Sequence, residues 1–306
     1  MTSSLVLGGA GFIGSHLAEA LARDGQRVRI FDRPHVDRLP QLQRFELFTG
    51  DFLNPQALAP AIAGAEVVFH LISTTLPKNS NDNPAYDVES NVLGTLRLLE
   101  LCRRHKVRKL VFVSSGGTVY GPPRSTPVRE DHPTEPICSY GVHKLMVEKY
   151  LQLEHHLHGL DYSVVRPPNL YGPRQRLDTA QGAVAVFLDR ALRGEPIEIW
   201  GDGSVVRDYI YVADAVEALV KASRFKGEPR VFNLGSGRGT SLKELVAEIE
   251  KLLGKPVKVN YSAARALDVP VNVLDASAAA RHLGWRASTP LAEGLRRTYD
   301  WLRASP

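Results

Sequence analysis

Residues 4–14 read SLVLGGAGFIG, a short apolar run followed at once by a turn rich in glycine. Gly8, Gly11 and Gly14 recur every third residue, and a helix-forming segment begins directly behind them. Glycine suits this turn because the backbone must turn tightly, approach a pyrophosphate closely and let the following helix pack against the strand. The N-terminus of such a helix presents free amides and a partial positive charge to an anion. The stretch therefore predicts the strand, turn and helix that open a dinucleotide-binding α/β fold.

Beyond this turn, short apolar runs alternate with segments of helix length, which is typical of a parallel sheet covered by helices. The runs are rich in Val, Ile, Leu and Phe, so strands buried on both faces are expected. We predict an α/β fold of the Rossmann type, with a doubly wound parallel sheet. Its strands are expected at 4–7, 27–32, 45–49, 67–71, 109–114 and 162–166, and its helices near 13–24, 55–63, 84–105 and 140–158.

The composition changes after Arg166, where Pro167, Pro168, Gly172 and Pro173 crowd together. We expect residues 1–168 to form the cofactor-binding domain and residues 169–306 to form mainly a smaller α/β substrate-binding subdomain. Segments near 206–236 are expected to return to the first domain. Further strands are expected at 197–200 and 231–234, and further helices at 181–193, 242–253 and 290–303.

The charge balance bears on partners. The 38 basic residues are dispersed among 33 acidic ones, and the resulting net charge of +5 suits an anionic small substrate at least as well as nucleic acid. No nucleic-acid partner is expected. No stretch approaches the roughly 18 consecutive apolar residues of a membrane span, and the N-terminus lacks the pattern of a signal peptide. We therefore expect a cytoplasmic protein with no membrane partner.

Metal binding is not expected. Cys102 and Cys138 are too few for a disulfide framework and lack the spacing of metal ligands. His155, His156 and His158 form a cluster, but we place them on a helix surface without a Cys or carboxylate set around them.

Asp32 ends the second expected strand, 18 residues beyond Gly14. A carboxylate there accepts hydrogen bonds from the ribose hydroxyls of a dinucleotide and repels a 2′-phosphate, so NAD is expected rather than NADP. Arg33 is the argument for NADP, because its guanidinium could pair with a phosphate if Asp32 turned away. Asp51 and Phe52 follow the third strand and are expected beside the adenine, with a plain surface loop as the alternative.

Tyr140 and Lys144 stand four residues apart, and hence on one face of a helix. A tyrosine has an ordinary pKa of about 10 and acts as a base near neutral pH only when positive charge stabilises its phenolate. Lys144, the helix N-terminus and an oxidised nicotinamide could supply that charge. The spacing alone is a weak signal, and it gains weight from the glycine-rich turn in the same chain.

These residues resemble the extended short-chain dehydrogenase/reductase family, and within it the UDP-glucose/UDP-galactose 4-epimerase group. The resemblance covers essentially the whole chain. Besides the glycine turn and the Tyr–Lys pair, it rests on NVLGT at 91–95, SSGGTVYG at 114–121, RPPNLYGPRQ at 166–175, RDYIYVAD at 207–214 and NLGSG at 233–237.

The resemblance implies roles for individual residues. Tyr140 would be the base, and Lys144 would orient it and contact the nicotinamide ribose. Asn169 and Arg207 would hold the UDP diphosphate, joined by Arg265, and Asn272 would border the sugar. The residues expected to bind NAD are Gly8, Gly11, Phe12, Ile13, Gly14, Asp32, Asp51, Phe52, Asn91, Ser114, Tyr140 and Lys144.

One position departs from the family pattern. Gly116 stands where relatives often carry the Ser or Thr that hydrogen-bonds the reacting hydroxyl. The assisting hydroxyl would then come from Thr118, Ser115 or Ser114, or from water. We favour Thr118 and Ser115, whereas strand-end hydrogen bonding is the better expectation for Ser114.

The implied activity is NAD-dependent epimerisation of a UDP-hexose at C4 through a transient 4-keto intermediate, in a homodimer. A UDP-glucuronate decarboxylase or a 4,6-dehydratase would share the fold and the Tyr–Lys pair. Both resemble patterns with an acidic residue directly before VYG, whereas this chain has Gly117 and Thr118 there. A sugar-nucleotide reductase and a non-catalytic cofactor-binding regulator are further alternatives. The sequence leaves open whether the sugar is glucose or galactose, an N-acetylated hexosamine or a uronic acid.

Overall fold

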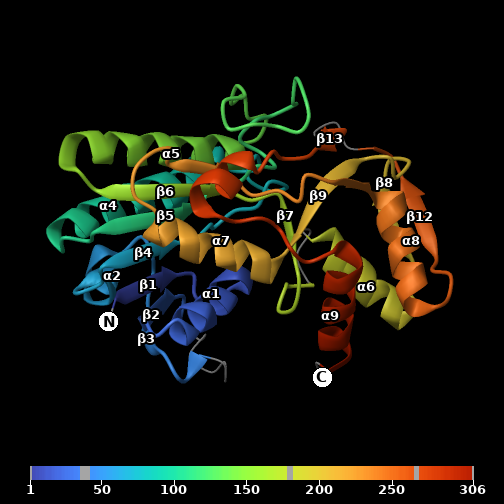
Figure 1. Cartoon of the computed structure of the whole chain (residues 1–306), viewed down its shortest axis with the longest axis horizontal. Coiled ribbons are helices and arrows are strands. Elements are labelled where there is room, and N and C mark those ends of the chain that lie inside the picture. Colours follow the sequence, from blue (N-terminus) through green and yellow to red (C-terminus); the bar gives the residue numbers. More distant parts are fainter. Residues whose placement is uncertain (1, 35–41, 178–181, 265–268, 305–306) are drawn as a thin grey trace.

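A computed structural model describes residues 2–34, 42–177, 182–264 and 269–304 of the chain (Figure 1). Seven parallel strands form the main sheet in the order β10-β6-β5-β4-β1-β2-β3. The chain winds outward in both directions from the junction of β1 and β4, which is where doubly wound sheets bind their ligands. The strands are β1 (Ser3–Leu7), β2 (Arg27–Asp32), β3 (Glu46–Thr49), β4 (Val67–His70), β5 (Lys109–Val113), β6 (Asp161–Arg166) and β10 (Val231–Asn233).

Helices cover both faces of this sheet. On one face α1 (Phe12–Arg23) packs against α7 (Val212–Arg224), and on the other α4 (Gly94–Arg104) packs against α2 (Pro55–Ile62) and α5 (Ser139–His158). Each face buries its own cluster of apolar side chains, because the central strands β1, β4 and β5 are buried along almost their whole length. The predicted Rossmann-type architecture is confirmed.

The helix expected over 84–105 is not continuous. It consists of α3 (Pro84–Asp87), a π-helical turn η3 (Val88–Leu93) and α4. Within the turn, Asn91 Nδ2 donates to the carbonyl oxygen of Asp87 at 3.0 Å, and Thr95 Oγ1 donates to that of Asn91 at 2.6 Å. Side chains thus take up carbonyls that a regular helix would pair along its backbone, and π turns of this kind are frequent at functional sites.

The C-terminal part is built around β9 (Val206–Tyr211), which the sequence analysis did not anticipate. It pairs with β7 (Asn169–Tyr171), β11 (Gly239–Ser241) and β13 (Val271–Asn272). A second small sheet joins β8 (Ile197–Trp200) to β12 (Val259–Ser262). The remaining elements are α6 (Ala183–Arg193), α8 (Leu242–Leu253), the π turn η4 (Ala279–Leu283) and α9 (Leu291–Ala304). Within the described ranges, no helix is long and apolar enough to cross a membrane.

Candidate active site

The glycine turn connects β1 to α1 at the carboxyl edge of the main sheet. Gly8 has φ of 81°, a left-handed conformation that suits glycine, and its amide donates to the Phe31 carbonyl at 2.9 Å. A Cβ at Gly14 would lie 2.1 Å from the Gly8 oxygen, so any side chain there would force strand and helix apart. Gly11 precedes α1 and has no side chain to cap it, which leaves the amides at Phe12 and Ile13 facing an open helix end.

Asp32 lies beside this turn. Its carboxylate accepts hydrogen bonds from the Ala10 and Arg33 amides, both at 2.8 Å. A carboxylate in this position meets the ribose of a dinucleotide whose pyrophosphate rests on the glycine turn. The turn, the uncapped helix and Asp32 together fit NAD.

Asp51 and Phe52, after β3, differ in exposure. Asp51 is exposed, and its carboxylate accepts a hydrogen bond from the Leu53 amide at 2.9 Å. The Phe52 ring is buried, with its centroid 5.3 Å from that of His70, and a Cβ on Gly94 would touch it. The Phe52 side chain therefore packs in the core and does not line the open edge of the sheet.

The Tyr140–Lys144 pair occupies the first turns of α5. Lys144 is buried; its Nζ donates to the Val113 carbonyl at 3.0 Å and lies 5.4 Å from the centre of the Tyr140 ring. Burial raises the pKa of Tyr140 to about 12, against a hydrogen bond with the Ser73 hydroxyl that lowers it. Burial lowers the pKa of Lys144 to about 8, against the charges of Asp87 and Glu148, which raise it. The phenol therefore needs the charge on Lys144, and further positive charge, before it can act as a base.

The hydroxyl groups after β5 fall into two kinds. Ser114 Oγ donates to Glu148 Oε1 on α5 at 2.5 Å, so its hydroxyl is used inside the protein. Thr118 Oγ1 is buried without a hydrogen-bond partner among the described residues, and Ser115 is half-buried. A Cβ on Gly141 would lie 2.7 Å from the Thr118 carbonyl, so Thr118 abuts the turn that carries Tyr140.

The departure at Gly116 has a steric cause. A Cβ on this residue would lie 2.3 Å from Cδ1 of Leu274, which is fully buried, and 3.1 Å from the Arg166 carbonyl. Leu274 thus fills the space that a serine or threonine at position 116 would need. The assisting hydroxyl has to come from elsewhere.

The sheet around β9 brings three of the expected substrate-binding residues together. Asn272 on β13 pairs with Arg207 on β9, and Asn169 starts β7, the other parallel neighbour of β9. Arg207 Nη1 donates to the Val269 carbonyl at 2.6 Å, and Asn169 Nδ2 to that of Asp208 at 3.3 Å. Arg265 lies outside the described residues.

Asn272 also connects this sheet to the loop after β5. Its Nδ2 donates to the Gly116 carbonyl at 3.2 Å, while its Oδ1 is buried and has no partner within the described ranges. Asn272 thereby places the small sheet against the segment that holds Thr118.

Asn91 is buried, and its amide is used inside the protein. Its Oδ1 accepts from the Thr74 amide at 3.0 Å, and its Nδ2 donates to Thr74 Oγ1 at 2.9 Å. It therefore holds the loop that also carries Ser73. The sequence analysis missed three residues of this region: Ser73 and Asp87, which no motif links to the Tyr–Lys pair, and His143, which lies next to Lys144 but was given no role.

Metal ligands are not gathered anywhere in the described parts of the chain: no group of three or more His, Cys, Asp or Glu side chains could hold an ion there.

Comparisons with known proteins agree with this geometry. Residues 4–235 match the model of the NAD dependent epimerase/dehydratase family. The UDP-glucose 4-epimerase of Mycolicibacterium smegmatis is 39% identical over 308 residues, covering 98% of both chains. The structure of a UDP-glucose 4-epimerase from Thermotoga maritima with UDP-glucose superimposes with a TM-score of 0.95 at 36% identity, covering 99% of both chains. One from Thermus thermophilus in complex with NAD gives 0.93 at 33% identity, covering both chains completely.

Proposed function

Because the chain belongs to the NAD-dependent epimerase/dehydratase family, we propose that it is an NAD-dependent UDP-sugar 4-epimerase that inverts the configuration of a UDP-hexose at C4. The observation that carries the proposal is that Lys144 lies beside the Tyr140 ring on a turn packed against the Thr118 backbone, at the edge of the sheet where the glycine turn and Asp32 also lie.

Tyr140 removes the proton of the C4 hydroxyl as that carbon is oxidised, and returns it after the 4-keto sugar has turned within the site. NAD, when bound, supplies the acceptor and donor of the hydride. Lys144 keeps positive charge beside the phenol, which makes the phenolate accessible near neutral pH. Thr118, with Ser115, donates a hydrogen bond to the reacting oxygen in place of the hydroxyl that Gly116 lacks.

Binding is divided between two parts of the chain. We assign NAD to residues 1–168 together with α7 and β10, which lie in the layers of the main sheet. The sugar nucleotide is assigned mainly to residues 169–306. Asn169 and Arg207 suit a diphosphate, because an amide and a guanidinium can donate several hydrogen bonds to its oxygens. Arg265 keeps the same proposed role.

C4 epimerisation is favoured over decarboxylation or 4,6-dehydration by the residues before VYG. Gly117 and Thr118 supply no carboxyl group there, and the backbone of Thr118 is packed against Gly141. The decarboxylase and dehydratase patterns have an acidic residue directly before VYG for chemistry at the neighbouring carbons. This chain has no acid at that position.

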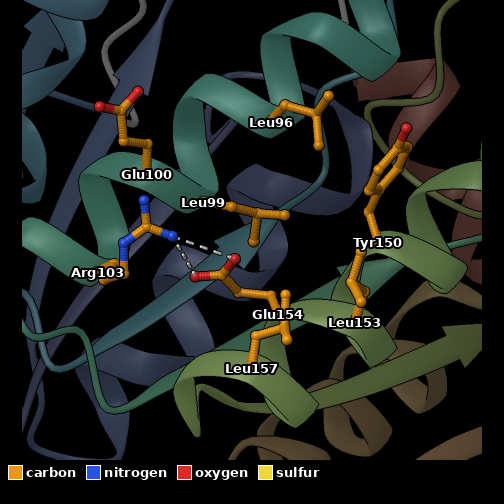
Figure 2. A pocket seen from close by; sticks show the side chains of 8 residues that line it. All are labelled: Leu96, Leu99, Glu100, Arg103, Tyr150, Leu153, Glu154 and Leu157. Atoms are coloured by element: carbon orange, nitrogen blue, oxygen red, sulfur yellow. Dashed lines mark hydrogen bonds and ion pairs between the residues drawn. The ribbon is translucent and has the colours of Figure 1, made fainter.

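A homodimer is also part of the proposal. Figure 2 shows a groove between α4 and α5 in which Leu96 and Leu99 face Leu153 and Leu157. Leu153 is 46% and Leu157 59% exposed, and with Leu96 and Leu99 they line one apolar groove, as is typical of a contact surface. The Arg103–Glu154 ion pair at 3.1 Å closes one end of the groove. We infer that a second copy covers it, so that α4 and α5 of both subunits form a four-helix bundle.

Sedimentation tests this. We expect a dimer at micromolar concentration and a monomer for Leu153→Glu/Leu157→Glu; a monomeric native protein contradicts the proposal. A cytoplasmic location, expected from the sequence, stays a prediction for cell fractionation.

The activity is tested by incubating the purified protein and NAD with UDP-glucose, UDP-galactose, their N-acetylated counterparts and UDP-glucuronate in separate reactions. Isomer formation at C4 is expected with at least one of them, and Tyr140→Phe is expected to abolish it while leaving UDP-sugar binding largely intact. A native protein that binds NAD but forms no isomer would favour the non-catalytic regulator, and decarboxylated or dehydrated products would favour the neighbouring activities.

A further inference from the structure

Asp87, the last residue of α3, is fully buried beneath the start of α5. Ser139 Oγ donates to its carboxylate at 2.6 Å, and His143 Nδ1 lies 2.9 Å from it. The Asn91 amide and the Thr75 hydroxyl bind the same carboxylate from the other side. Because Ser139 and His143 flank Tyr140 in the helix, one carboxylate holds the turn that carries the proposed base on both sides.

The same segment also supplies the cap of α5. Cys138 stands at the cap position but makes no side-chain cap. Instead, Ser80 Oγ accepts a hydrogen bond from the Tyr140 amide at 3.0 Å, and Asn81 Oδ1 accepts one from the Ser139 amide at 2.8 Å. These are amides that a helix N-terminus otherwise leaves unpaired. Residues 80–87 therefore fix the start of α5 from outside the helix.

The protonation states of the pair follow from these contacts. Burial opposes ionisation of Asp87, but hydrogen bonds from Ser139, Thr75 and His143 outweigh it and hold the pKa of Asp87 below its ordinary value. Burial, together with the nearby charge of Lys144, lowers the pKa of His143 to about 4. At neutral pH Asp87 is thus a carboxylate that can only accept, and His143 is a neutral imidazole that donates through Nδ1.

Because His143 is neutral, the negative charge of Asp87 is not balanced by a positive charge on this hydrogen-bond partner. Glu148, on α5, is one of the charged groups around Lys144. Its carboxylate already accepts hydrogen bonds from Nε and Nη2 of Arg166, at 2.9 and 2.5 Å. His143 and His70, the latter from β4, are both neutral at neutral pH. Asp87 and Glu148 both favour the buried ammonium of Lys144, and Asp87 is the one of the two that no guanidinium already binds.

We propose that Asp87 is a positioning residue for the Tyr140–Lys144 pair: through His143 and Ser139 it fixes the first turn of α5, and it places a buried negative charge beneath that turn. The proposal rests on the function argued above, in which the charge on Lys144 activates Tyr140.

The decisive variant is Asp87→Asn, which keeps the size of the side chain and removes its charge. Activity needs a protonated Lys144, so it is lost as the pH rises through the pKa of that group. Asp87→Asn is expected to move this alkaline limb of the kcat profile down by about one pH unit. His143→Asn retains a donor near the position of Nδ1 and is expected to keep most of the activity, whereas His143→Leu is not.

Hydrogen exchange gives a readout that does not depend on turnover. The amides of residues 139–144 are expected to exchange roughly tenfold faster in Asp87→Asn, because the turn loses part of its external support. The milder Ser139→Ala, which leaves the carboxylate in place, should speed exchange in the same peptide and carries this test if Asp87→Asn fails to fold.

Asp214→Asn is the matched control. Asp214 is another buried carboxylate, and it accepts four hydrogen bonds from Ser288 and Thr289 at a site remote from α5. It is expected to cost stability while leaving both the alkaline limb and the exchange of 139–144 in place.

The outcomes separate this proposal from the proposed function. An alkaline limb that stays at its native pH in Asp87→Asn, with activity lowered equally at all pH values, overturns the electrostatic role. Unchanged exchange at 139–144 in Asp87→Asn, or in Ser139→Ala where the first does not fold, overturns the positioning role even if the native protein proves to form no isomer.

Discussion

Two buried polar clusters follow one another along helix α5 and differ in how completely they are paired. At Glu148, Arg166 binds the carboxylate through two hydrogen bonds and donates to the Tyr120 hydroxyl at 2.8 Å. That hydroxyl in turn donates to Asn233 Oδ1 at 2.7 Å, and Ser114 completes the set by donating to Glu148. We refer to these five residues as the Arg166 cluster.

The turns of α5 before Glu148 carry Tyr140, Lys144 and their neighbours, and here the pairing is incomplete. His143 Nε2, Thr118 Oγ1 and Asn272 Oδ1 are buried without partners in the part of the chain that the structure describes. A buried unpaired polar atom costs about 1–3 kcal/mol, so a protein has no reason to keep several together for stability. The difference indicates that the Arg166 cluster serves the fold, and it supports the proposal that the unpaired atoms around Tyr140 meet polar atoms of a ligand.

The largest expected effect of this division is on turnover. Lys144→Met should lower kcat about 10³-fold, because the phenol loses its charged neighbour. It should not lower the free energy of unfolding, since the depressed pKa of Lys144, about 8, means that burying this ammonium opposes folding at neutral pH. Activity assays and urea unfolding at pH 7 check both parts. A loss of several kcal/mol would make Lys144 a stabilising residue and break the comparison.

The opposite result is expected in the Arg166 cluster. Glu148→Gln leaves a buried guanidinium without its carboxylate and should lower the free energy of unfolding by about 3–5 kcal/mol, with kcat of the folded protein changed less than tenfold. The control is Glu293→Gln on α9. Its partner Arg297 is 52% exposed, so a cost close to zero is expected. Equal costs for the two variants would contradict the assignment.

The buried histidines His143 and His70 are expected to make the free energy of unfolding depend on pH. Burial lowers the pKa of His143 to about 4 and that of His70 to about 3, so both are neutral when folded but gain a proton below about pH 6.5 when unfolded. Their contribution to stability is complete above pH 6.5 and is lost as the pH falls toward those values. Between pH 7.5 and 5 we expect a loss of about 2 kcal/mol for each, measured by urea unfolding. His143→Asn should reduce the loss by about that amount, and an undiminished loss would contradict the neutral state of His143.

Thr118 is expected to have a smaller effect. Thr118→Val keeps the shape but removes the unpaired hydroxyl, and should lower kcat about 10²-fold while leaving stability unchanged or slightly higher. Thr118→Ser should stay near the native rate. If Ser115→Ala has the larger effect on kcat, the assisting hydroxyl belongs to Ser115.

The sequence predicts those parts of the molecule that depend on local pattern. The strand at 27–32 and the helix at 242–253 have the expected bounds, and the glycine turn lies where the residues 4–14 place it. Strand β9 was missed because the adjacent charged residues Arg207 and Asp208 interrupt its short apolar run, and it is completed by pairing with β7 and β13.

Long-range contacts account for the rest of what the sequence did not predict. The absence of a side chain at Gly116 is explained only by Leu274, which lies 158 positions away along the chain. The contact of Asp87 with His143 depends likewise on how α3 packs against α5. Neither contact produces a characteristic residue spacing, so a single sequence could not reveal it.

The last and smallest expected effect concerns which sugar the proposed site beside Asn272 admits. Asn272 is 2% exposed and donates to the Gly116 carbonyl, with Leu274 filling the space next to that glycine. A tyrosine at 272 therefore has no room toward Gly116 and has to extend toward the proposed sugar site. A steric gate discriminates by clash, so Asn272→Tyr should exclude an N-acetylated hexose more than a plain one. We expect the ratio of kcat/KM for UDP-GlcNAc to that for UDP-glucose to fall about tenfold, as differences of a few atoms in a pocket commonly produce. Asn272→Ser, which is smaller and still polar, should leave the ratio near its native value. If the ratio is the same in native protein and Asn272→Tyr while both remain folded, Asn272 does not border the sugar, and its unpaired Oδ1 serves the contact between the two sheets instead.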